Sequence, residues 1–254
     1  MTEGRYVYCI VESSQKAQLG NIGIDGSRVY AIPYQNICAI VHNSPSKPYE
    51  SKDDEVVKNW VIKHETVIER AWEKLGTVLP FGFDTIIKAD EGKDPEEIVK
   101  YWLESDYQSL KEKLDKVRGK AEYAVQVSWD TKVISQLLTE KDEELEKLSE
   151  EIKSKPKGAA YMYKQKLEKL LRGKLEREGE KYFKEFYGRI KEYTDEIKIE
   201  KLKKDEEQRQ MIMNVSCLAD KKDVKALGDE LDKINNMEGF FVRFTGPWPP
   251  YSFV

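Results

Sequence analysis

The chain has 254 residues, 39% hydrophobic and 35% charged, and its 43 Lys and Arg against 47 Asp and Glu give a formal net charge of -4. This length supports one large domain or two ordinary ones, and we prefer two. The acidic balance argues against a nucleic-acid-binding protein, whose surface would be basic. The three cysteines, Cys9, Cys38 and Cys217, lie in apolar runs without C-x-x-C spacing, so we expect buried, reduced thiols rather than disulfides or a zinc site.

The first 50 residues have the composition of strands joined by a loop. Arg5–Val11 is apolar, β-branched and aromatic, and it is followed by a loop-like stretch rich in Ser, Gly and Asn that extends to Ser27. Arg28–Ile32 and Gln35–His42 flank a short break at Pro33-Tyr34. We predict a central strand followed by a strand pair.

A helical pattern begins at Asp53. Apolar residues then recur at steps of three and four up to Gly76, which predicts an amphipathic helix lying over a sheet. Thr77–Lys88 predicts a strand interrupted by Pro80 and Gly82, and Pro95–Val117 predicts a second helix.

A strand predicted at Ala121–Trp129 follows this second helix. Taken together, the alternation of strands and helices indicates an α+β fold whose N-terminal domain, residues 1–120, is a ferredoxin-like sandwich. We place the domain boundary between Gly119 and Trp129.

Beyond Trp129 the composition becomes strongly charged, with leucines at heptad-compatible spacing. We predict a long antiparallel helical hairpin over residues of about 131–191, broken at Lys155–Gly158. Glu196–Leu202 reads as a short strand or a helix end. The other predicted elements are a strand at Met211–Leu218, a helix at Val224–Ile234 and a strand at Gly239–Thr245. Residues 121–254 thus form a second α+β domain.

The tail, residues 246–254, is rich in proline and aromatic residues, whereas chain ends are usually loose. Its prolines restrict the backbone, and Trp248, Tyr251 and Phe253 supply apolar area for docking. Three interpretations stay open: the tail fills a groove between the protein's own domains, binds another protein through its apolar surface, or serves as a proline-rich ligand for an aromatic groove.

The tail sequence G-P-W-P-P-Y-S-F resembles the ending of the gas vesicle protein F and L family. Three further stretches are similar to that family. Tyr6–Val11 looks like its opening strand, with Cys9 where glycine is usual. His64–Val67 followed by Val78–Phe83 looks like its first helix and the next strand, with Gly82 where arginine is usual. Glu122–Val127 resembles the strand after the second helix. The match covers both halves of the chain and leaves F-type against L-type open.

The resemblance implies an accessory structural protein of gas vesicle assembly, in the cytoplasm and associated with the gas vesicle. Its expected partners are the small major gas vesicle shell protein and other gas vesicle accessory proteins. It implies no catalysis, cofactor, metal, membrane, nucleic acid or small-molecule substrate.

Two aromatic groups are candidate protein-interaction residues. The first occupies adjacent turns of the predicted hairpin and consists of Tyr182, Phe183, Phe186 and Tyr187; the second is Trp248, Tyr251 and Phe253 in the tail. The hairpin residues either close the hairpin's own seam or face a partner helix.

The sequence contains little material for catalysis. His42 and His64 are its only histidines, no H-E-x-x-H or phosphate-binding glycine motif is present, and the paired acids lie in first turns of helices or on charged faces. An alternative is a small-ligand-binding or enzymatic ferredoxin-like domain with a polar pocket near the histidines or the first helix. A weaker one is an RNA-binding module using Tyr6, Tyr8 and Tyr123.

Overall fold

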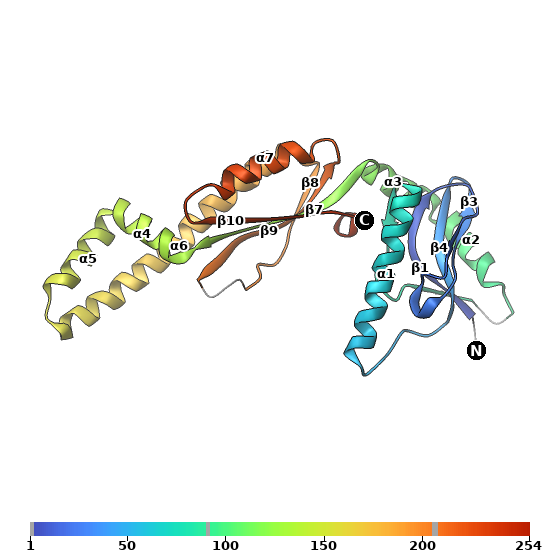
Figure 1. Cartoon of the computed structure of the whole chain (residues 1–254), viewed down its shortest axis with the longest axis horizontal. Helices are drawn as coiled ribbons and strands as arrows, with labels where there is room; N and C mark the ends of the chain where they lie inside the picture. Colours follow the sequence, from blue (N-terminus) through green and yellow to red (C-terminus); the bar gives the residue numbers. More distant parts are fainter. Residues whose placement is uncertain (1–2, 90–91, 205–207) are drawn as a thin grey trace. The chain divides into compact units, whose positions relative to one another are not determined.

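The computed structural model of the chain describes residues 3–89, 92–204 and 208–254. It divides into two compact units, Met1–Glu122 together with Pro247–Val254, and Tyr123–Gly246 (Figure 1). The chain therefore leaves the first unit after Glu122 and returns to it after Gly246. The sequence places the tail in the second domain, residues 121–254, whereas its contacts in the structure group Pro247–Val254 with the first unit.

The sheet of unit 1 is built around its first strand. β1 pairs antiparallel with β4 on one side and with β5 and β6 on the other, and the order across the sheet is β2-β3-β4-β1-β5. This arrangement explains why β1 is apolar along nearly its whole length, as the sequence predicted. The strands are β1 (Glu3–Glu12), β2 (Gln18–Gly20), β3 (Val29–Tyr34), β4 (Ile37–Pro45), β5 (Val78–Pro80) and β6 (Ile86–Lys88).

A β-bulge in β1 decides which side chains face which helix. The register with β4 shifts between Val7 and Cys9, and a bulge lets consecutive residues point to the same face. Tyr6, Tyr8 and Cys9 consequently belong to one core cluster, while Val7 and Ile10 belong to the other.

Helices cover both faces of this sheet (Figure 1). α1 (Asp54–Leu75) packs Val67, Ile68 and Ala71 on the tyrosine face. α2 (Pro95–Ser105) and α3 (Tyr107–Val117) cover the other face, so the predicted helix 95–117 is divided at Asp106. The N-terminal unit is therefore a three-layer arrangement.

The ferredoxin-like order predicted for residues 1–120 is found in unit 2 instead. The strand order is β10-β7-β9-β8, and the elements follow one another as strand, helices, strand, strand, helix, strand, which is the β-α-β-β-α-β succession of ferredoxin-like domains. The difference arises because β7, expected to complete the first domain, pairs with β9 and β10. The elements are β7 (Lys120–Asp130), β8 (Glu196–Ile199), β9 (Arg209–Asp220), α7 (Val224–Asn235) and β10 (Phe240–Trp248).

The helical hairpin replaces the first crossover helix of this unit. It consists of α4 (Thr131–Lys141), α5 (Glu143–Ser154) and α6 (Lys157–Lys191), so its first arm is two helices rather than one. The break falls at Asp142, whose carboxylate accepts hydrogen bonds from the first backbone N–H groups of α5 and pairs with Lys174. The α+β class that the sequence predicts is confirmed, and the structure adds that strand pairs in both sheets are antiparallel.

Candidate functional site

The tail is tied to unit 1 by a buried acid and a buried ring. Glu122, 8% exposed, accepts hydrogen bonds from both the backbone nitrogen and the hydroxyl of Ser252, each at 2.7 Å. Phe253 is buried, its carbonyl accepts from Lys116, and Val254 packs on the cluster beneath α2 and α3. The docked tail is thus an intramolecular element of unit 1.

The tail's other aromatic residues are more accessible. Trp248 is 45% exposed and Tyr251 39%. Burial of the hydroxyl and the carboxylates of Glu65 and Glu69 raise the pKa of Tyr251. Because Phe253 is held inside while Trp248 and Tyr251 reach the surface, only these two could meet a partner with the tail in place.

The aromatic residues of α6 divide between two faces of the helix. Tyr182 and Phe186 point inward, where their rings meet Phe240, and Tyr182 also meets Trp129. Phe186 is fully buried. A buried ring cannot contact a partner in this state, so the structure does not favour the contact role predicted for Phe186.

Phe183 and Tyr187 lie one residue further round the helix and are half-buried. Their rings stack on each other with centroids 6.0 Å apart. Leu175, Gly179 and Phe183 recur at steps of four, which places them on one face of α6. This stripe is the part of α6 that a partner can reach.

An apolar groove lies between this stripe and the start of β9. Its volume is about 340 Å³. Leu202, which is 59% exposed, Met211 and Ile212 line it together with the residues of α6. The polar groups of its lining, which any partner must satisfy, belong to Glu176, Glu180, Lys184 and Gln210.

The groove continues along α6. A neighbouring hollow of about 300 Å³ shares Leu175, Glu176 and Gln210 with it and extends to Glu168 and Leu171. From Glu168 to Lys184 the helix rises about 24 Å at about 1.5 Å per residue. Together the two hollows form the α6 groove.

Contacts with the rest of unit 2 fix the position of α6. Near its C-terminal end, Arg189 Nε donates to Glu230 of α7 at 2.6 Å, and Lys233 Nζ donates to the same carboxylate at 2.7 Å. These hydrogen bonds hold the pKa of Glu230 below its usual range. At Gly179 the helix also passes close to Trp129, since a Cβ built there would lie 3.4 Å from the indole, in van der Waals contact. The helix that lines the groove is therefore held in place by contacts with α7 and Trp129.

Both histidines are used structurally. His64 Nε2 lies 3.0 Å from the Phe81 carbonyl, which can only accept, so Nε2 carries the proton. Its Nδ1 then accepts from the Tyr6 hydroxyl at 2.9 Å, and that hydroxyl accepts from the Asp84 backbone nitrogen. His64 is 3% exposed, so the chain of bonds joins α1, β1 and the loop before β6 out of reach of a substrate.

His42 occupies the same kind of position on β4. Its Nδ1 lies 2.8 Å from the Tyr8 hydroxyl and its Nε2 3.0 Å from that of Tyr49, while Ile24 donates its backbone N–H to Tyr8. Burial lowers the pKa of His42 to about 4 and also lowers that of His64. Both histidine rings are therefore neutral, buried and engaged in hydrogen bonds within unit 1.

The structure also bears on the nucleic-acid alternative. Tyr6 and Tyr8 are fully buried and Tyr123 is 3% exposed, whereas base stacking needs exposed rings.

Among the described residues, no group of three or more His, Cys, Asp and Glu side chains is arranged so that it could hold a metal ion. In the same part of the chain, no helix is both long and apolar enough to cross a membrane.

Sequence reasoning found one wall of the α6 groove and missed the other. Leu171, Leu175 and Phe183 belong to the apolar repeat that predicted the helix. Leu202 and Met211 come from a polar stretch and a strand start, and no local pattern links them to α6. The structure reveals this part of the lining because Leu202, a large apolar side chain, is 59% exposed beside α6.

Comparison with known proteins gives consistent results. The family model for "Gas vesicle synthesis protein GvpL/GvpF" matches residues 4–254. Gas vesicle protein L1 of Halobacterium salinarum is 31% identical over 261 residues, covering 100% of this chain and 91% of that protein. Gas vesicle protein F of Nostoc is 21% identical, covering 100% and 98%. The crystal structure of GvpF from Anabaena superposes with a TM-score of 0.77 at 21% identity, covering 99% and 98%.

Proposed function

This chain belongs to the GvpL/GvpF family of gas vesicle synthesis proteins, and on that premise we propose that it binds the major gas vesicle shell protein during nucleation or growth of the vesicle. The family supports a role in gas vesicle assembly. The identity of the partner and the surface that binds it are the parts proposed here.

The observation that carries the proposal is the α6 groove. The hollow beside β9 is lined mainly by apolar side chains, Leu202 in it is 59% exposed, and the two hollows together extend along about four turns of α6. An amphipathic helix laid along it would bury its apolar face against Leu175, Phe183 and Leu202, in the manner of other helix-in-groove complexes.

The energetic basis is hydrophobic. A shell subunit that has not yet assembled exposes apolar helix and strand surface, which would otherwise aggregate. Each large apolar side chain that moves from water into the groove contributes about 1.5–3 kcal/mol. A few such residues are enough for a reversible complex, which suits a protein that must hand its partner to a growing shell.

The polar groups of the lining make this contact selective. Glu168, Glu176 and Glu180 outnumber Arg172 and Lys184 in the lining, and Arg172 is already paired with Glu176 at 3.3 Å. This small excess of acids favours a partner helix that carries basic residues beside its apolar face. We place the protein in the cytoplasm at the gas vesicle, together with other accessory proteins. We assign it no catalytic step.

Co-precipitation with the shell protein tests the groove. Phe183→Asp and Leu202→Asp each put a charge into it from a different element, and Leu202 is exposed enough that its replacement should not affect folding. Tyr161→Asp, on the same helix outside the groove and 64% exposed, is the matched control. We expect recovery of the shell protein to fall for both groove variants and to stay at the wild-type level for the control. Wild-type recovery with Leu202→Asp would refute the proposal.

A further inference from the structure

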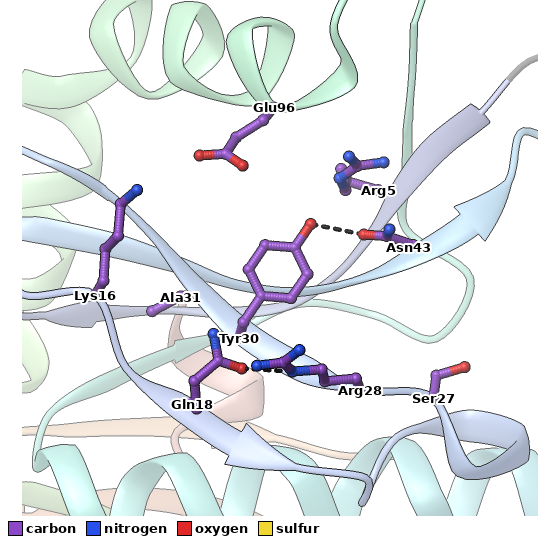
Figure 2. A pocket seen from close by; sticks show the side chains of 9 residues that line it. All are labelled: Arg5, Lys16, Gln18, Ser27, Arg28, Tyr30, Ala31, Asn43 and Glu96. Carbon is purple, nitrogen blue, oxygen red and sulfur yellow. Dashed lines mark hydrogen bonds between the residues drawn. The ribbon is translucent and has the colours of Figure 1, made fainter.

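A polar hollow in unit 1 is separate from the α6 groove. Its volume is about 510 Å³, and β1, the segment leading into β2, β3, β4 and α2 all contribute to it. Figure 2 shows Tyr30 at its centre, with Lys16 and Arg5 on either side and Glu96 approaching from α2. Arg28 and Asn43 complete the polar lining.

The charges around the hollow are mainly positive. Arg5, Lys16 and Arg28 line the hollow together with one acid, Glu96, while the carboxylate of Asp94 also lies close enough to act on Tyr30; the whole chain has a net charge of -4. Glu96 is already paired with Lys100 at 3.7 Å. Within the described part of the chain, no acid lies within ion-pair distance of Lys16 or Arg28, and Arg28 Nε donates to the neutral Gln18 amide. The hollow thus carries excess positive charge.

Arg5 is the unusual member of this group. It is only 6% exposed; its Nη1 donates to the Gly4 carbonyl at 3.0 Å, but its Nε has no hydrogen-bond partner. Its one acid partner among the described residues is Glu3 at 3.8 Å, a side chain that is itself 68% exposed. Buried charges are normally compensated by close ion pairs and complete hydrogen bonding. An anion in the hollow would supply part of the missing compensation.

Neutral hydrogen-bonding groups lie beside these cations. The Tyr30 hydroxyl donates to Asn43 Oδ1 at 2.7 Å, which fixes the orientation of that amide and leaves its two N–H groups as donors. Burial raises the pKa of Tyr30, and the Arg5 guanidinium opposes that rise. The Tyr30 hydroxyl is therefore protonated and uncharged at neutral pH, and adds no negative charge to the hollow.

We infer that this hollow is a binding site for an oxyanion, a carboxylate or phosphate group held by Lys16, Arg28 and Arg5 with the Asn43 amide. Charge-assisted hydrogen bonds from Lys and Arg to such oxygens are the strongest that side chains make. The group belongs either to a free small molecule or to an acidic segment of a protein. The inference does not depend on binding of the shell protein, which concerns unit 2.

The test is a titration of the isotopically labelled full-length protein followed by backbone amide NMR shifts at neutral pH and constant ionic strength. One series uses inorganic phosphate and the other a short polyglutamate peptide. We expect saturable shifts at Lys16, Arg28 and Ala31 with at least one probe, and the probe that binds more tightly identifies the source of the anion.

Three variants make the result specific. The double variant Lys16→Ala, Arg28→Ala should weaken binding about tenfold or more. Glu96→Gln removes the one acid of the lining and should tighten binding about two- to fivefold. Lys63→Ala, on the exposed face of α1, is the control and should change nothing. Linear shifts with both probes, or an affinity that the double variant leaves unchanged, would overturn the inference.

Discussion

Acidification should weaken unit 1 through its two buried histidines. In the folded protein His42 is neutral, with its pKa lowered from 6.5 to about 4. In the unfolded chain its pKa returns to the usual value. Between these two values the unfolded state binds more protons than the folded state, so stability is complete above about pH 6.5 and falls as the pH drops toward about 4.

The size of this effect follows from the two pKa values. At about pH 5.5, protonation of His42 in the unfolded chain lowers the free energy of unfolding by about 1.4 kcal/mol, and the loss approaches about 3.4 kcal/mol below about pH 4. Burial also lowers the pKa of His64. The stability lost when His64 is protonated in the unfolded chain therefore adds to the stability lost through His42.

NMR of the histidine ring protons against pH measures the cause, and urea unfolding measures the consequence. The chain has only two histidines, both in unit 1, so the two signals are easily followed. We expect neither ring to titrate near 6.5 and the urea midpoint to fall with pH. A His42 titration centred near its ordinary pKa would refute the burial and bonding described for the Tyr8–His42–Tyr49 network.

Three further predictions concern stability and are read from chemical denaturation. Phe186→Ala should lower the free energy of unfolding by about 3–5 kcal/mol because its ring fills the core of unit 2, and an unchanged midpoint would contradict that burial. Phe253→Ala should cost clearly more than Trp248→Ala, since the first ring is 3% exposed and the second 45%; the reverse order would argue against the docked tail. Asp130→Ala should cost about 1 kcal/mol through the loss of the α4 cap, whose carboxylate accepts from Lys132 and Val133, whereas Asp130→Asn should restore most of it.

Helices and strands whose formation depends on residues adjacent in the sequence could be predicted from local patterns. The start of α1 was predicted because Asp53 supplies the capping carboxylate that the structure shows, and β1 because its residues are buried on both faces. The division of the hairpin's first arm was missed. The signal was present, since Asp142 before Glu143 and Glu144 is a typical helix start.

Pairing between strands that lie far apart in the sequence could not be predicted from these local patterns. β7 follows the helices of unit 1 in sequence, yet it pairs with β9 and β10, about 80 or more residues further along. The ferredoxin-like prediction for residues 1–120 was therefore wrong, and the succession in the second half was predicted only as an α+β domain. The α6 groove was hidden in the same way, because Leu202 meets α6 only after folding.

The oxyanion site illustrates a different limit. Arg5 lies at the start of an apolar strand, where a sequence pattern predicts a solvated end residue. Only the structure shows it buried beside Tyr30 and Asn43. Polar clusters assembled from several strands leave no periodic trace, so their detection depends on tertiary contacts.

Site-specific photocrosslinking in cells that make gas vesicles tests most directly the claim that the protein holds the shell subunit in the α6 groove. A photoreactive phenylalanine analogue replaces Leu202 in one strain and Tyr161 in another; both positions are exposed, but only Leu202 lines the groove. The proposal predicts a covalent adduct with the major shell protein from position 202 and none from position 161. Adducts from position 161 alone, with none from position 202 at equal expression, would contradict it.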